Sequence, residues 1–111
     1  MNPIKLIHID PMLHNAVRLK IMVALDSLES ANFMYLCEIT DAARGNVSIQ
    51  LKTLQEAGYI EVSRSGSGPV AQTICRITQL GIKALHEYEK ELHKLFSKEA
   101  SNEEESISVA G

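Results

Sequence analysis

A chain of 111 residues, 45% of them hydrophobic, has room for a single domain with one modest core and excludes a separate catalytic or sensor domain. It has no apolar run of 18 residues, so no membrane span is expected, and residues 1–10 lack the pattern of a secretory signal. The formal net charge of −3 is unfavourable for a nucleic-acid partner, but residues 1–98 hold 11 Lys and Arg against 10 Asp and Glu and are close to neutral.

The chain begins with an apolar segment that precedes the first long helix. Four side chains make residues 1–10 too hydrophobic for a free tail: Ile4, Leu6, Ile7 and Ile9. The sequence leaves open whether they pack on their own domain or on a second copy. Asp10-Pro11 predicts a turn or a helix start, and a helix is expected to run to about Leu28. Its predicted buried stripe is Val17, Ile21, Ala24, Leu25 and Leu28, with Leu19 and Met22 alongside.

A short helix and a turn are predicted next. Residues 34–39 are expected to be helical, with Phe33 forming a short strand just before them. Asn32 is the candidate cap, because Met34 has no side-chain oxygen to accept a backbone N–H. Residues 40–45 are the predicted turn, so the segment reads as the first half of a helix-turn-helix.

The following helix, expected over residues 46–57, has two contrasting faces. Val47, Leu51 and Leu54 are spaced as one apolar face, with Asn46 as the expected N-cap and Gly58 placed to close the helix. The opposite face comprises Asn46, Ser48, Ile49, Lys52 and Thr53. Such groups can meet base edges and phosphates, although any amphipathic surface helix also has a polar face.

A hairpin is predicted after this helix. Residues 59–64 alternate in polarity as a half-buried strand does, residues 65–69 form a glycine-rich tip, and residues 73–77 form the return strand. The tip itself is uncharged, and only Arg64 and Arg76 flank it.

Thr78 is expected to cap a long final helix. Its apolar side chains recur at intervals of three and four: Ile82, Leu85, Tyr88, Leu92, Leu95 and Phe96. This is more apolar surface than a small core can cover, which predicts a dimer seam. Residues 99–111 are predicted to be a disordered acidic tail that contains Glu99, Glu103, Glu104 and Glu105.

The segment GNVSIQLKTLQEAGYIEVSR resembles the recognition helix and first wing strand of winged helix-turn-helix transcriptional regulators, near the MarR and ArsR groups. The resemblance covers roughly residues 11–95, with Arg18-Leu19 and the Thr78-x-x-Gly81 helix start as outer matches. It implies an α+β, mostly α fold, in which residues 1–98 form a winged helix-turn-helix with a two-stranded wing and a long C-terminal dimerisation helix. It also implies a cytoplasmic homodimer that binds double-stranded DNA as a transcriptional regulator, with repression as the default.

Carried onto this sequence, the resemblance predicts two sets of site residues. Asn46, Ser48 and Thr53 are candidates for base edges, and Ile49 for a thymine methyl group. Arg44, Lys52 and Arg64 are candidates for phosphates, with Arg76 as a further basic residue of the wing. The predicted dimer residues are Leu85, Tyr88, Leu92, Leu95 and Phe96. Compared with its relatives, the chain has an uncharged wing tip, which weakens the expectation of minor-groove contact.

Other classes of site have little support in the sequence. His86 and His93 are seven residues apart, about 10 Å along a helix, so a single chain could not use both on one ion, and no metal or other cofactor is expected. Cys37 and Cys75 are expected to be free thiols in a reducing compartment. An enzyme is not expected. Two alternatives stay open: a protein-interaction module that has lost DNA binding, and a regulator that senses an unidentified effector.

Overall fold

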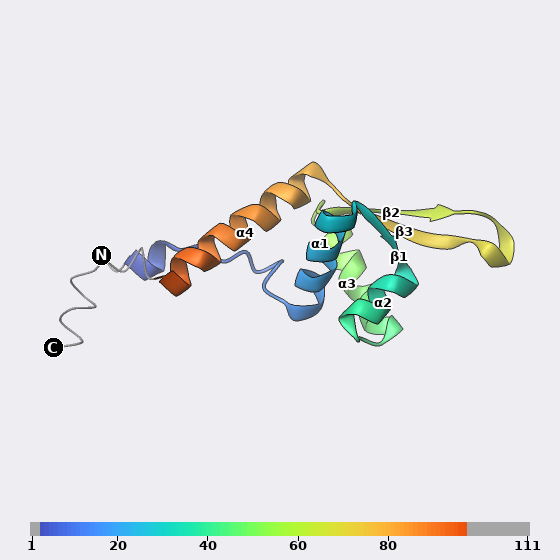
Figure 1. Cartoon of the computed structure of the whole chain (residues 1–111), viewed down its shortest axis with the longest axis horizontal. Helices are drawn as coiled ribbons and strands as arrows, with labels where there is room; N and C mark the ends of the chain where they lie inside the picture. Colours follow the sequence, from blue (N-terminus) through green and yellow to red (C-terminus); the bar gives the residue numbers. More distant parts are fainter. Residues whose placement is uncertain (1–2, 98–111) are drawn as a thin grey trace.

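The computed structural model describes residues 3–97 (Figure 1), so the predicted acidic tail of residues 99–111 lies outside the described residues. A short 3-10 helix, Pro3–Leu6, precedes the domain. The order of the remaining elements is α1 (Ala16–Leu28), β1 (Ser30–Asn32), α2 (Phe33–Thr40), α3 (Arg44–Glu56), β2 (Ile60–Ser65), the 3-10 turn Gly68–Val70, β3 (Gln72–Ile77) and α4 (Gln79–Ser97). The three strands form an antiparallel sheet in the order β1-β3-β2. The predicted winged helix-turn-helix architecture is therefore confirmed.

Helix α1 begins later than Asp10-Pro11, where the sequence suggested a start. Residues 10–14 form a turn, in which the N–H groups of Leu13 and His14 donate to the Asp10 carbonyl. Asn15 then caps α1 by accepting a hydrogen bond from the Arg18 N–H at 2.9 Å. The predicted burial of Leu28 is wrong, because this side chain, at the last residue of α1, is 50% exposed.

The helix-turn-helix is made by α2 and α3. Asn32 caps α2 as predicted, accepting from the Tyr35 N–H at 2.8 Å, but Phe33 belongs to the helix and not to the strand before it. Helix α3 starts at Arg44, two residues before the predicted Asn46 cap, because the Ala43 carbonyl already accepts the Val47 N–H. Asn46 is consequently free of a capping role and faces outward from the first turn.

The far end of α3 closes as the sequence predicted. Gly58 has a φ of 82°, and its N–H donates to the Gln55 carbonyl while the Tyr59 N–H donates to the Leu54 carbonyl. This pair of bonds is a Schellman motif, which needs a left-handed residue at the glycine. The chain therefore turns directly from α3 into β2, and the helix and the wing hairpin are held at a defined angle.

The core lies between α1, the helix-turn-helix, the sheet and the first half of α4. Its fully buried members include Leu13, Ile21, Met22, Leu25, Leu36, Val47, Leu54 and Cys75. Burial raises the pKa of the Cys75 thiol to about 11, so this free cysteine stays protonated near neutral pH. Leu85 and Tyr88 of α4 are also buried in this core, and the Tyr88 hydroxyl is hydrogen-bonded to His14 Nδ1 at 3.0 Å.

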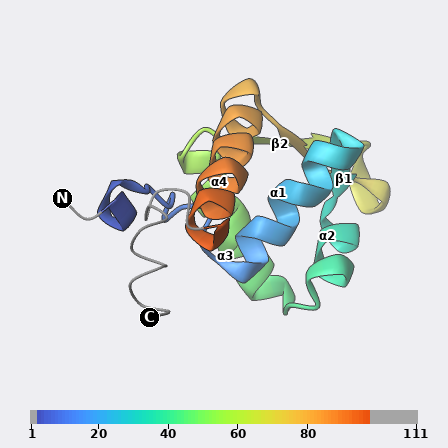
Figure 2. The ribbon, with the colours of Figure 1, turned by 60° about the vertical axis from the view of Figure 1, so that its left-hand side comes forward.

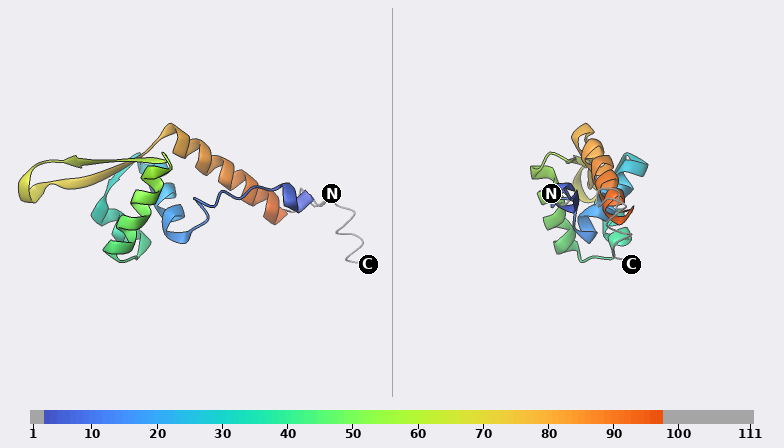
Figure 3. Two further views of the ribbon diagram at one scale, coloured as in Figure 1. Left: turned by 180° about the vertical axis from the view of Figure 1, so that it is seen from behind. Right: turned by 90° about the vertical axis from the view of Figure 1, so that its left-hand side faces the viewer.

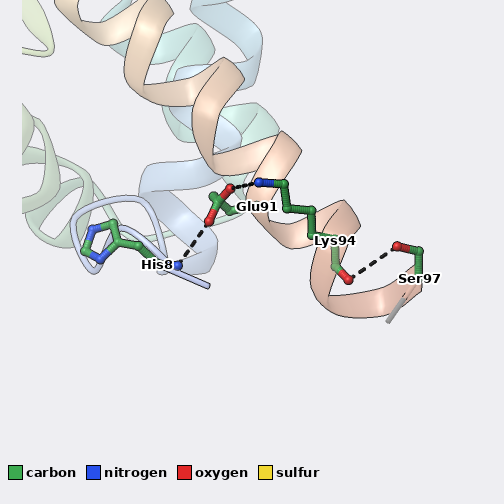
Figure 4. Close-up of polar contacts among 4 residues, drawn as sticks. All are labelled: His8, Glu91, Lys94 and Ser97. Carbon is green, nitrogen blue, oxygen red and sulfur yellow. Dashed lines mark hydrogen bonds and ion pairs between the residues drawn. The ribbon is translucent and has the colours of Figure 1, made fainter. Parts of the chain in front are cut away.

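The N-terminal segment lies along α4 of its own chain. The His8 N–H donates to Glu91 Oε1 at 3.1 Å, and the Lys94 ammonium approaches Glu91 Oε2 at 3.0 Å (Figure 4). The hydrogen bond from Lys94, helped by the one from His8, lowers the pKa of Glu91. Ile9 packs against the core, whereas Leu6 is 66% exposed. The N-terminal segment therefore packs on its own chain, which is one of the two arrangements that the sequence left open. The apolar side chains on the outer side of this segment remain exposed.

Gly81 allows α4 to cross close to the start of β2. A Cβ atom at this position would lie 2.2 Å from the Tyr59 carbonyl oxygen and 3.1 Å from Met22 Cε. The same carbonyl accepts the Thr78 N–H at 3.0 Å, and Thr78 Oγ1 caps α4 by accepting from the Gly81 N–H at 2.9 Å. The start of α4 is thus tied by hydrogen bonding and close packing to the residue that precedes β2.

We predict that Gly81→Ala lowers the free energy of unfolding by about 2 kcal/mol or more, because the overlap with Tyr59 outweighs the gain in helix propensity of about 1 kcal/mol. Gly45→Ala is the matched control in α3, since a Cβ there meets nothing within 4 Å. It should raise the free energy of unfolding by roughly 0.5–1 kcal/mol. Urea denaturation of both variants measures the difference, and equal effects would show that the close approach at Gly81 is not a constraint.

Candidate nucleic-acid interface

The outer face of α3 presents the polar side chains that the sequence pointed to. Val47, Leu51 and Leu54 are buried on one side of the helix. The exposed residues on the other side include Arg44, Asn46, Ser48, Ile49 and Lys52, with Ile49 63% exposed. Seen from behind, α3 lies in front of α1 and beside the base of the wing hairpin (Figure 3). No described element covers this face, so an elongated partner could lie along it.

Thr53 differs from the other predicted contact residues. It is half-buried, and its hydroxyl donates to the Ile49 carbonyl one turn earlier, at 3.0 Å. A hydroxyl that donates within its own helix can still accept a hydrogen bond through its lone pairs, but it has no second hydrogen to donate. Thr53 is therefore a weaker candidate for reading base edges than Asn46 or Ser48.

Helix α3 and the wing share one groove of about 550 Å³. Ser48, Lys52 and Gln55 line it from the helix side, and Val62, Arg64 and Thr73 from the hairpin side, with Phe33 and Leu51 between them. Arg64 donates from Nη1 to Thr73 Oγ1 across the hairpin at 3.3 Å. The structure thus brings Arg64 to the same groove as Ser48 and Lys52, which the sequence could not establish.

Arg76 lies on the other face of the sheet. Its register partners are Ser30 and Glu61, whereas Arg64 pairs with Thr73 and Val62 pairs with the buried Cys75. Successive side chains of a strand point to opposite faces, so Arg76 faces away from the side on which Cys75 and Arg64 lie. The predicted grouping of Arg64 and Arg76 is not formed, and we leave Arg76 out of the candidate interface.

Two residues that the sequence did not single out for contact support the interface. Arg18 of α1 donates from Nη1 to the Gln50 side-chain oxygen, and Gln50 Nε2 donates to Asn46 Oδ1 at 3.0 Å. Arg18 was expected only to belong to a core helix. The available signal was the spacing of Asn46 and Gln50, since residues four apart are neighbours on a helix surface. Arg18 reaches these residues only through the tertiary structure, and no local sequence pattern predicts the contact.

The predicted dimer residues divide into two groups along α4. Leu85 and Tyr88 are buried in their own chain, so they have little surface left for a partner. Leu92 and Leu95 are half-buried, and Phe96 is 76% exposed. Beside them, α1 and α4 lie next to each other (Figure 2) and enclose a mostly apolar groove of about 300 Å³. It is lined by Leu19, Val23, Asp26, Leu85, His86, Tyr88, Glu89 and Leu92.

Within residues 3–97, no three His, Cys, Asp or Glu side chains gather in a way that could hold a metal ion. His86, one of the two histidines considered from sequence, has Asp26 Oδ2 at 3.3 Å from its Nε2. None of the described helices is both long and apolar enough to cross a membrane.

Comparison with known proteins identifies relatives with the same architecture. The sequence profile of a family described as "Winged helix DNA-binding domain" matches residues 17–96. The uncharacterized protein MJ0432 of Methanocaldococcus jannaschii is 35% identical over 82 residues, which cover 74% of this chain and 89% of that protein.

Solved structures share the fold at low sequence identity. A transcriptional regulator homologue from Pyrococcus horikoshii superposes with a TM-score of 0.78 at 23% identity, covering 88% of this chain and 97% of that one. A MarR mutant from Escherichia coli in complex with operator DNA has a TM-score of 0.65 at 13% identity, covering 90% of this chain and 73% of that one.

The two arginines of the hairpin provide a matched test of which sheet face meets DNA. Arg64→Ala should weaken binding to duplex DNA and reduce the slope of log affinity against log salt concentration by about one, because one phosphate contact is lost. Arg76→Ala removes the same charge from the opposite face and should leave the slope unchanged. Fluorescence anisotropy between 50 and 200 mM salt, roughly the range over which such contacts are screened, measures both. Equal slopes for the two variants would contradict the assignment of the groove face.

Proposed function

The chain belongs to the winged helix DNA-binding domain family, and from this we propose that it is a sequence-specific transcriptional regulator that binds double-stranded DNA as a homodimer. The observation that carries the proposal is the shared groove, in which exposed Ser48 and Lys52 of α3 face Arg64 of the wing. In this proposal α3 lies in the major groove, where Asn46, Ser48 and Ile49 meet base edges. Arg44, Lys52 and Arg64 contact phosphates.

The charge distribution sets the strength that we expect of this interaction. Residues 1–98 are close to neutral, so the domain lacks the large positive field that gives tight non-specific binding. The basic side chains on the α3 and wing side are few, and Glu56 lies exposed at the end of the same helix. Non-specific affinity should therefore be modest, and selectivity must come from contacts to bases. Occupying a site is the simplest way in which a DNA-binding domain regulates, which is why we propose repression.

Two substitutions on α3 test the proposed function. Lys52→Ala should weaken binding to all duplex sequences and lower the salt slope by about one, because a phosphate contact carries no sequence information. Asn46→Ala should cost about 1–3 kcal/mol on the preferred site and less on random DNA. The preferred site is obtained beforehand by selection from a randomised duplex library. A parent protein that shows no salt-dependent binding to duplex DNA would contradict the proposal and favour the protein-interaction module.

The effector-sensing alternative has one observation in its favour. The groove between α1 and α4, at about 300 Å³, reaches the lower end of the size of small-molecule sites and is mostly apolar. A thermal shift on adding candidate metabolites or metal ions would distinguish a sensor from a regulator that responds to DNA alone.

We place the homodimer contact at the free end of α4 and the N-terminal segment. Phe96 is exposed and Leu92 and Leu95 are half-buried, and the N-terminal segment alongside this end of α4 (Figure 1) carries the exposed Leu6 and Ile4. Burying such side chains contributes about 1.5–3 kcal/mol each, so a second copy covering this surface would be strongly stabilised. Two-fold pairing would place the two α3 helices on successive major grooves, roughly 34 Å apart, and call for a pseudo-palindromic site.

The dimer is tested by sedimentation of the parent and of a double variant, Leu92→Glu with Leu95→Glu. The parent should sediment as a dimer at micromolar concentration, and the double variant as the 12.3 kDa monomer, because two buried carboxylates would oppose pairing. Val70→Glu is the control, since Val70 is an exposed apolar residue on the wing and lies outside α4. A monomeric parent would exclude the dimer and the palindromic site together.

A further inference from the structure

Arg18 is held in place by hydrogen bonds and orients the side chains at one edge of the candidate interface. The Arg18 side chain is half-buried, and its Nε donates to the Met12 carbonyl at 2.6 Å while Nη2 donates to the Pro11 carbonyl at 3.4 Å. Its remaining contact is from Nη1 to Gln50 Oε1 on α3. The guanidinium is thus held on one side by the turn before α1 and directs a donor at α3 from the other.

The chemistry of these groups sets the direction of every hydrogen bond that follows. A guanidinium has only donors, so Gln50 must present its oxygen to Arg18 and its NH₂ group to the opposite side. There Gln50 Nε2 donates to Asn46 Oδ1 at 3.0 Å. Asn46 must therefore turn its oxygen toward Gln50, which leaves its own NH₂ group at the outer end. Asn46 is exposed, and among the described residues no partner is present for this NH₂ group.

We infer that Arg18 and Gln50 are positioning residues that fix the hydrogen-bond polarity of Asn46, so that its amide presents a donor to the major groove and selects a base with an acceptor there. The inference rests on the proposed function. In the major groove guanine presents N7 and O6, thymine presents O4, and adenine presents N7 beside its N6 amino donor, whereas cytosine presents only the N4 amino donor. The base opposite Asn46 is accordingly guanine, thymine or, through N7, adenine, and cytosine is rejected because two donors would face each other.

This role goes beyond that of a helix clamp. An unrestrained Asn side chain can rotate by half a turn and offer either end, so it discriminates poorly between donor and acceptor edges. The Arg18–Gln50–Asn46 relay fixes one orientation of the Asn46 amide before DNA binds. The side-chain entropy of Asn46 is therefore already lost in the free protein and is not lost again on binding. Neither Arg18 nor Gln50 needs to touch DNA for this effect. The effect is on which base is preferred, and the number of phosphate contacts is unchanged.

Gln50→Glu tests the inference by reversing the relay. The carboxylate still accepts from Arg18, in a charge-assisted bond, but it has no hydrogen to give to Asn46. Asn46 must then turn its NH₂ group inward and present Oδ1 to the groove. Asn46→Asp, which has acceptors only, presents an oxygen outward in the same way and marks the base position concerned. Both variants should shift the preference at that position away from guanine and thymine and toward cytosine, by roughly ten-fold in relative selection, with adenine, which has both an acceptor and a donor, changing least.

The measurement is selection of duplexes from a randomised library by the full-length parent and each variant, followed by sequencing. Gln79→Glu is the charge control, because Gln79 is an exposed residue at the start of α4 and lies outside the relay. It should select the same bases as the parent. Thermal melting checks the fold, and Gln50→Glu should melt at or above the parent temperature because the partner of Arg18 is retained. Gln50→Met, which can neither donate nor accept strongly, should flatten the preference at the same position without reversing it.

The outcomes separate this inference from the function on which it rests. A shift in Asn46→Asp with no shift in Gln50→Glu or Gln50→Met would overturn the relay, although Asn46 would still contact a base. Unchanged selection by all three variants would exclude base contact by Asn46 and leave DNA binding itself in place. A parent that enriches no sequence would overturn both this inference and the proposed function.

Discussion

The domain depends on the burial of one face of α1. All three other helices contact α1, as do β1 and β3. Its residues Ile21, Met22 and Leu25 are fully buried, so the neighbouring elements pack around this face of α1. Because the apolar faces of α3 and α4 are both occupied at this centre, their opposite faces must point outward. The candidate interface is thus a consequence of how the core closes.

The junctions between elements convert this packing into a defined orientation of the wing. The Schellman motif at Gly58 leads from α3 into β2, and Gly81 brings α4 against the Tyr59 carbonyl at the start of that strand. The Tyr59 hydroxyl donates to Asp10 Oδ2 at 2.6 Å, which ties the same junction to the turn before α1. Burial and the neighbouring Asp10 raise the Tyr59 pKa to about 12, so the phenol remains a donor at any physiological pH. The groove between α3 and the wing is therefore preformed.

Helix α4 serves two purposes along its length. Its first half completes the core through Leu85 and Tyr88, and its second half, with Phe96, runs beyond the domain alongside the N-terminal segment. One amphipathic stripe can do both, because an α-helix repeats its apolar face regardless of what lies opposite each turn. The part of α4 that stabilises the domain is therefore distinct from the part on which we propose that a dimer assembles.

The sequence by itself determined the elements, because their signals are local. The apolar spacing of Val47, Leu51 and Leu54 identified α3, and Gly58 identified its end, since only one residue type adopts a left-handed conformation readily. The predicted helix start at Asn46 was wrong, because Ala43 and Arg44 carry no capping signal and the backbone bond from Val47 to Ala43 starts the helix at Arg44. These signals, with the family resemblance, were enough for the fold and for the exposed face of α3.

Only the tertiary structure decided how residues distant in sequence are combined. Arg64 and Arg76 looked equivalent as flanks of one hairpin, but the strand register places them on opposite faces of the sheet. Leu85 and Leu92 belonged to one stripe, but Leu85 is buried in the core, whereas Leu92 is only half-buried at its edge. Arg18 lies 32 residues from Gln50, and no local pattern relates them. Such pairings follow from the closure of the whole core around α1, which depends on all the side chains at once and cannot be read from any single segment.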